Sequence, residues 1–74
     1  MLRVGLAGFG YWGPNLARAL NSLEGAQFAA IAENSPAKLS DAKEIYGNIS
    51  TFQSVEDLIE SSSIDALVIA MPAN

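Results

Sequence analysis

Three glycines near the amino terminus have a spacing that predicts a ligand site. Gly8, Gly10 and Gly13 follow a short apolar run and form the pattern G-x-G-x-x-G. At these offsets the first glycine permits a tight turn out of a strand. The second lets a pyrophosphate approach the backbone, and the third lets a helix pack closely on the strand. A plain strand-to-helix turn needs one or two glycines, so the full pattern favours dinucleotide binding.

The residues after the second glycine would place main-chain N–H groups at the start of a helix, where they attract phosphate. These residues are Tyr11 and Trp12. The side chains of Tyr11 and Trp12 have two interpretations. They contact the ligand, or they cover the loop and pack against another part of the protein.

An acidic residue stands where the second half of this pattern requires one. Glu33 lies twenty positions after Gly13, at the predicted end of the second strand. A carboxylate there accepts hydrogen bonds from the adenine ribose hydroxyls and repels a 2′-phosphate. The next residues are Asn34 and Ser35, not arginine. The sequence therefore predicts NAD in preference to NADP, while Lys38 leaves NADP possible.

The apolar pattern predicts alternating strands and helices around these residues. The expected strands cover residues 2–7, 27–32, 50–52 and 65–71, and the expected helices cover 11 or 12 to about 23, 36–46, and a short stretch after Ser54. Such an alternation predicts an α/β fold with a parallel sheet. We expect a partial Rossmann-type, doubly wound sheet with strand order 3-2-1-4 and flanking helices.

Caps and buried positions follow from the same pattern. Ser35 followed by Pro36 is typical of a helix start, and Gly47 of a helix end. Ser54 and Asp57 resemble a capping box. The side chains expected to face the sheet are Leu16, Leu20, Leu23, Leu39, Ala42, Tyr46, Val55, Leu58 and Ile59.

In this strand order the chain reverses direction between the first and fourth strands, and ligands bind at that switch point. The loop after the fourth strand should therefore face the glycine loop. The predicted cofactor-binding residues are Gly8, Phe9, Gly10, Tyr11, Trp12, Gly13, Glu33, Asn34, Ala70, Met71, Pro72 and Asn74. No catalytic or metal-binding residue is predicted.

Composition narrows the classes of protein. The 74 residues carry a net charge of −4, which argues against a nucleic-acid surface. There is no cysteine or histidine, so a disulfide framework and the commonest catalytic base are missing. No signal peptide or membrane-length apolar run is present, and a cytoplasmic protein without a membrane partner is expected.

Three segments together resemble the start of the Gfo/Idh/MocA family, which includes glucose–fructose oxidoreductase and inositol dehydrogenase. They are residues 4–16, 31–33 and 64–72. The resemblance implies a full-length NAD(P)-dependent dehydrogenase that exchanges hydride with a sugar, cyclitol or nucleotide-sugar hydroxyl. It also implies a homo-oligomer. Where the family usually has threonine before the proline, this sequence has Met71.

The family's catalytic Glu-Lys-Pro motif and its later histidine or aspartate have no counterpart in residues 1–74. We therefore expect this chain to be the amino-terminal portion of a dinucleotide-binding domain, inactive alone, with the substrate domain elsewhere. Two other classes remain. One is a non-catalytic, NAD(H)-binding regulatory module. The other is a methyltransferase using S-adenosylmethionine, which the three-glycine pattern disfavours.

Overall fold

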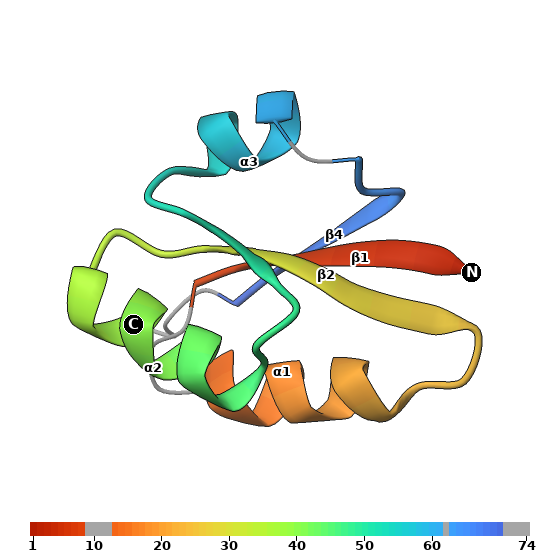
Figure 1. Cartoon of the computed structure of the whole chain (residues 1–74). Helices are drawn as coiled ribbons and strands as arrows, with labels where there is room; N and C mark the ends of the chain where they lie inside the picture. Colours follow the sequence, from red (N-terminus) through yellow and green to blue (C-terminus); the bar gives the residue numbers. More distant parts are fainter. Residues whose placement is uncertain (9–12, 62, 71–74) are drawn as a thin grey trace.

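The computed structural model describes residues 1–8, 13–61 and 63–70. Strands and helices alternate along the chain, as predicted (Figure 1). The elements are β1 (Leu2–Ala7), α1 (Gly13–Ser22), β2 (Ala26–Ala32), α2 (Pro36–Ile45), β3 (Ser50–Phe52), α3 (Val55–Ser61) and β4 (Ala66–Ile69).

The four strands form one parallel sheet in the order β3-β2-β1-β4. This order confirms the prediction from the sequence. In Figure 1, α1 and α2 cover one face of the sheet and α3 covers the other. Because the strands are parallel, their carboxyl ends meet at one edge, and β1 and β4 lie side by side there.

The register between β1 and β2 contains an irregularity. Val4 pairs with Phe28, but Gly5 pairs with Ala30, so Ala29 is an extra residue in β2. A bulge of this kind resets the alternation of side chains. As a result Phe28 and Ile31 both join the core beneath α1 and α2, although their spacing is odd.

The core under α1 and α2 is built from both helices and the three longer strands. Leu20 is buried, and Leu16 and Leu39 are half-buried against the same cluster. The prediction for Leu23 is wrong, since its side chain is 54% exposed. Helix α1 ends at Ser22, and Leu23 lies in the turn that leads into β2.

The opposite face is thinner and is covered by α3. Leu58 is fully buried there, and Val55 packs beside it. A Cβ placed on Gly5 would stand 3.0 Å from Ile64 Cδ1 and 3.3 Å from Leu58 Cδ2, so the bare glycine admits these side chains. The prediction that Ile59 is buried is wrong, because it is 56% exposed.

Several predicted boundaries also differ from the structure. Strand β2 begins one residue earlier than predicted, at Ala26, and α2 ends one residue earlier, at Ile45. The three serines at 61–63 predict a turn, but Ser61 is the last residue of α3. Strand β4 is shorter than the predicted 65–71, since it ends at Ile69 and residue 71 lies outside the described part. The physical reason is that β1 ends at Ala7, which pairs with Ile69, and the chain turns at Gly8 with a φ of +96°.

Among the described helices, none has both the length and the apolar character needed to cross a bilayer.

Candidate functional site

Gly8 joins the ends of three strands. Its N–H donates to the Ala32 carbonyl oxygen at 2.7 Å, which connects it to the end of β2. A Cβ added to Gly8 would stand only 2.6 Å from the Ala70 carbonyl oxygen, just after β4. The Ala70 N–H in turn donates to the Ala7 carbonyl oxygen at 2.8 Å. These contacts bring the start of the glycine loop and the end of β4 together, as the switch point requires.

Glu33 follows β2 directly and is held at both its backbone and its side chain. Its N–H donates to the Phe52 carbonyl oxygen at 2.9 Å, which fastens it to the end of β3. Its Oε2 accepts the N–H of Ser35 at 2.8 Å. The residue is half-buried, so its carboxylate is placed at the carboxyl edge of the sheet with a defined orientation.

Three further predicted positions can be located. Gly13 is the first residue of α1. Asn34 is exposed in the turn between β2 and α2. Ala70 is half-buried against Gly8. The remaining predicted site residues lie outside the described part of the chain, namely Phe9, Gly10, Tyr11, Trp12, Met71, Pro72 and Asn74.

This arrangement fits a dinucleotide. A side chain at Gly8 would collide with the Ala70 carbonyl oxygen, so the glycine lets the chain after β4 pack directly against the start of the glycine loop. The first turn of α1 contains no acidic residue that would compete with a phosphate for the helix dipole. Glu33 supplies a hydrogen-bond acceptor at the end of the neighbouring strand. Within residues 1–8, 13–61 and 63–70, no group of three or more side chains forms a metal site.

The sequence did not reveal the partner of the Glu33 carboxylate. Ser35 was expected only as the N-cap of α2, and its Oγ does accept the Lys38 N–H at 3.4 Å. The main-chain N–H of Ser35 donates to the Glu33 carboxylate. The only available signal was the short spacing between an acidic residue and a helix cap, and that spacing alone does not fix the side-chain rotamer.

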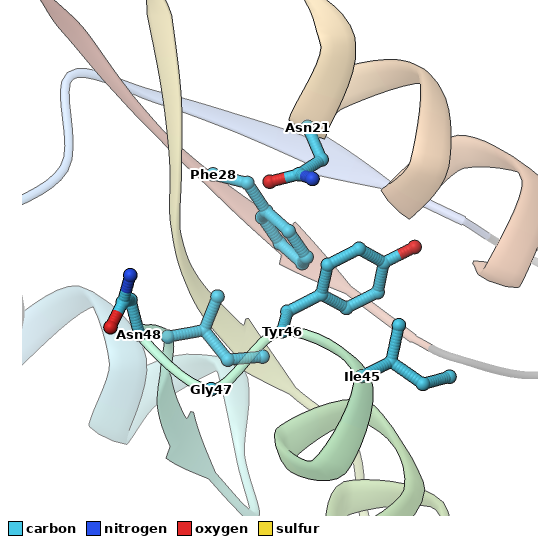
Figure 2. A pocket seen from close by; sticks show the side chains of 7 residues that line it. Asn21, Phe28, Ile45, Tyr46, Gly47 and Asn48 are labelled. Atoms are coloured by element: carbon cyan, nitrogen blue, oxygen red, sulfur yellow. The ribbon is translucent and has the colours of Figure 1, made fainter.

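An open pocket of about 210 Å³ lies elsewhere, near the end of α2 (Figure 2). Its lining includes Phe28 and Tyr46, whose rings meet edge to face with centroids 5.2 Å apart. Phe28 pairs with Val4 in the amino-terminal half of the sheet, away from Gly8 and Glu33. The polar side chains in its lining are the neutral ones of Asn21, Tyr46 and Asn48, so it offers a phosphate no opposite charge.

Comparison with known proteins agrees with this arrangement. Residues 2–74 match the model of the Gfo/Idh/MocA oxidoreductase family, which has an NAD-binding Rossmann fold. Among curated proteins, an inositol 2-dehydrogenase from Corynebacterium glutamicum strain R is 36% identical over 72 residues. The alignment covers 96% of this chain and 21% of that protein.

Solved structures of dehydrogenases also superpose on this chain. Scyllo-inositol dehydrogenase from Lactobacillus casei, with bound NAD(H) and scyllo-inositol, superposes with a TM-score of 0.90 at 27% identity, over 97% of this chain and 22% of that one. The WlbA dehydrogenase from Bordetella pertussis, in complex with NADH and UDP-GlcNAcA, superposes with a TM-score of 0.86 at 30% identity. The superposition covers 96% of this chain and 20% of that one. The chain thus spans about a fifth of the length of these relatives.

Proposed function

The chain belongs to the Gfo/Idh/MocA oxidoreductase family with an NAD-binding Rossmann fold, and we propose that it binds the adenosine and pyrophosphate part of NAD(H). The observation that carries this proposal is the placement of Gly8 and Glu33 at one sheet edge. The Gly8 N–H donates a hydrogen bond to the Ala32 carbonyl oxygen, and Glu33 is the next residue after Ala32. The start of the glycine loop and the carboxylate that would accept from the ribose are therefore fixed relative to each other.

Each group has a separate role in the proposed complex. The backbone that leads from Gly8 into Gly13 would hold the pyrophosphate, with the dipole of α1 adding attraction. Glu33 would accept hydrogen bonds from the adenine ribose hydroxyls. Ala70 would form the opposite wall of the crevice. When bound, the nicotinamide supplies hydride transfer, and this chain's residues supply binding and orientation.

We further propose that the whole protein oxidises or reduces a hydroxyl-bearing carbon of a sugar, cyclitol or nucleotide sugar. Support comes from the relatives, since the similar proteins include inositol dehydrogenases and a dehydrogenase crystallised with UDP-GlcNAcA. The test is an NADH absorbance assay on the full natural protein with NAD⁺ and myo-inositol, scyllo-inositol or UDP-GlcNAcA. Tight NAD(H) binding without turnover of any polyol or nucleotide sugar would favour a regulatory module instead.

Substitution of Glu33 tests the ribose assignment. Glu33→Ala should weaken NADH binding by roughly ten- to a hundredfold, because hydrogen bonds to a charged group contribute about 1.5–3 kcal/mol. NADPH affinity should stay the same or rise, because the carboxylate no longer repels the 2′-phosphate. Calorimetric titration of the full natural protein with both nucleotides measures this change.

Lys38→Ala is the matched control. Lys38 lies in the first turn of α2 and its side chain is exposed. Its removal should leave NADH affinity unchanged and can only lower NADPH affinity. Identical NADH affinities for the Glu33→Ala protein and the unsubstituted protein would remove Glu33 from the site.

A further inference from the structure

The turn between β2 and α2 already contains an anion in contact with the helix start. Glu33 Oε2 accepts the Ser35 main-chain N–H at 2.8 Å, and Ser35 is the N-cap of α2. The other two polar groups of Ser35 also have partners. Its Oγ accepts the Lys38 N–H and its carbonyl oxygen accepts the Leu39 N–H. Each polar group of Ser35 therefore takes part in a hydrogen bond at the start of α2.

The backbone of Glu33 is fixed independently of its side chain. Its N–H donates to the Phe52 carbonyl oxygen at 2.9 Å, so the end of β3 sets the position of its Cα. The Ser35 N–H then restrains the direction in which the carboxylate leaves that Cα. A glutamate on a surface turn otherwise samples several rotamers, because three side-chain torsions are free.

We propose that the main-chain amide of Ser35 is a positioning group that determines cofactor specificity. This inference rests on the proposed function. By holding the Glu33 carboxylate in place before any ligand arrives, the amide presents a ready acceptor to the ribose hydroxyls. It also keeps a negative charge at the start of α2, where a helix dipole would otherwise attract a 2′-phosphate.

The expected change in NADH affinity follows from the ordering of the Glu33 side chain by the Ser35 amide. Fixing one flexible side chain on binding costs about 0.5–1.5 kcal/mol, which corresponds to roughly two- to tenfold in affinity. A protein without the amide should have weaker NADH binding by that factor. Its NADPH binding should not weaken in parallel, because the phosphate gains nothing from the fixed carboxylate. The ratio of the two affinities is therefore the quantity to measure.

The experiment compares two substitutions at position 35 in the full natural protein. Ser35→Ala removes the hydroxyl and keeps the N–H. Ser35→Pro removes both, so the difference between the two variants reports the loss of the N–H together with the restriction of φ. Calorimetric titration should show NADH binding two- to tenfold weaker in Ser35→Pro than in Ser35→Ala, with a smaller NADH-to-NADPH affinity ratio.

Proline also restricts φ, and Ser35 has a φ of −91°. A second pair avoids this restriction: replacement of residue 35 by lactic acid, the ester analogue of alanine, removes the N–H and leaves φ free. It is compared with Ser35→Ala in the same way. Equal affinity ratios in the ester protein and Ser35→Ala would overturn the inference while leaving the proposed function intact. Failure of the unsubstituted protein to bind NADH would overturn the proposed function itself.

Discussion

Gly8 and Gly25 both have a positive φ, of 96° and 78°, but their surroundings differ. A Cβ on Gly8 would stand 2.6 Å from a backbone oxygen, that of Ala70, while a Cβ on Gly25 would meet nothing within 4 Å. Gly25 is therefore required for its conformation alone. Gly8 is required for its conformation and for the close approach of β4, which forms part of the candidate site.

This difference predicts unequal costs of substitution. Gly25→Ala should lower the free energy of unfolding by about 1–2 kcal/mol, the cost of a left-handed conformation with a side chain. Gly8→Ala should lower it by a further 1–3 kcal/mol or so, because the added methyl collides with backbone that cannot move aside easily. Urea unfolding followed by circular dichroism measures both. Equal losses in the two variants would contradict the close contact with Ala70.

Helix α3 buries only one of two adjacent apolar side chains. Leu58 and Ile59 are adjacent and similar in volume, but Leu58 is fully buried and Ile59 is 56% exposed. Leu58 lies over Gly5, Ala30 and Ala32, whose small side chains let the helix approach the sheet. The orientation of α3 is set by this small-residue surface.

Separate alanine substitutions of Leu58 and Ile59 distinguish their contributions to the free energy of unfolding. Leu58→Ala should cost about 2–5 kcal/mol of unfolding free energy, because it opens a cavity between α3 and the sheet. Ile59→Ala should cost less than about 1 kcal/mol, since it removes mainly exposed surface. Denaturant midpoints of the two variants give the comparison. A larger loss for Ile59→Ala would mean that α3 presents its other side to the sheet.

The sequence predicted which elements form because its signals are local. Ser35 and Pro36 begin α2, and Ser54 caps α3 through the Asp57 N–H. The strand order followed from the Rossmann-type glycine pattern. Burial at element ends was predicted less well. Leu23 continues the helical spacing of α1 but lies beyond its end, where the turn at Gly25 directs the chain into β2.

Features that depend on a partner strand could not be predicted. The extra residue Ala29 in β2 exists only relative to β1, and both strands are too uniformly apolar to reveal it. The same limit applies to the candidate site. The position of Glu33 followed from its spacing to Gly13, whereas its contact with the Ser35 amide depends on how the turn folds.

Across the whole molecule, the candidate site depends on three strands at once. Gly8 contacts the end of β2 through Ala32 and the end of β4 through Ala70. A ligand held there binds only when all three strand ends are in register. Binding energy should therefore stabilise the sheet as a unit and not one strand alone.

The expected result is a shift in global stability. NADH at a hundred times its dissociation constant should raise the free energy of unfolding of the full natural protein by about 2.7 kcal/mol. The same concentration of NADPH should raise it less, because Glu33 disfavours the 2′-phosphate. Hydrogen exchange of β1, β2 and β4 amides reports whether protection rises in all three strands. Added protection confined to β1 would contradict the shared site.

The contacts of β1 also have a consequence for synthesis on the ribosome. Arg3 donates its N–H to the Asp65 carboxylate across 62 positions of sequence, and β1 pairs on its other edge with β2. One edge of β1 therefore stays open until the last of the four strands has left the exit tunnel. An unpaired apolar edge invites pairing with another chain. The nascent chain is accordingly open to such pairing during that interval, and a nucleotide that needs Ala70 beside Gly8 binds too late to cover the edge.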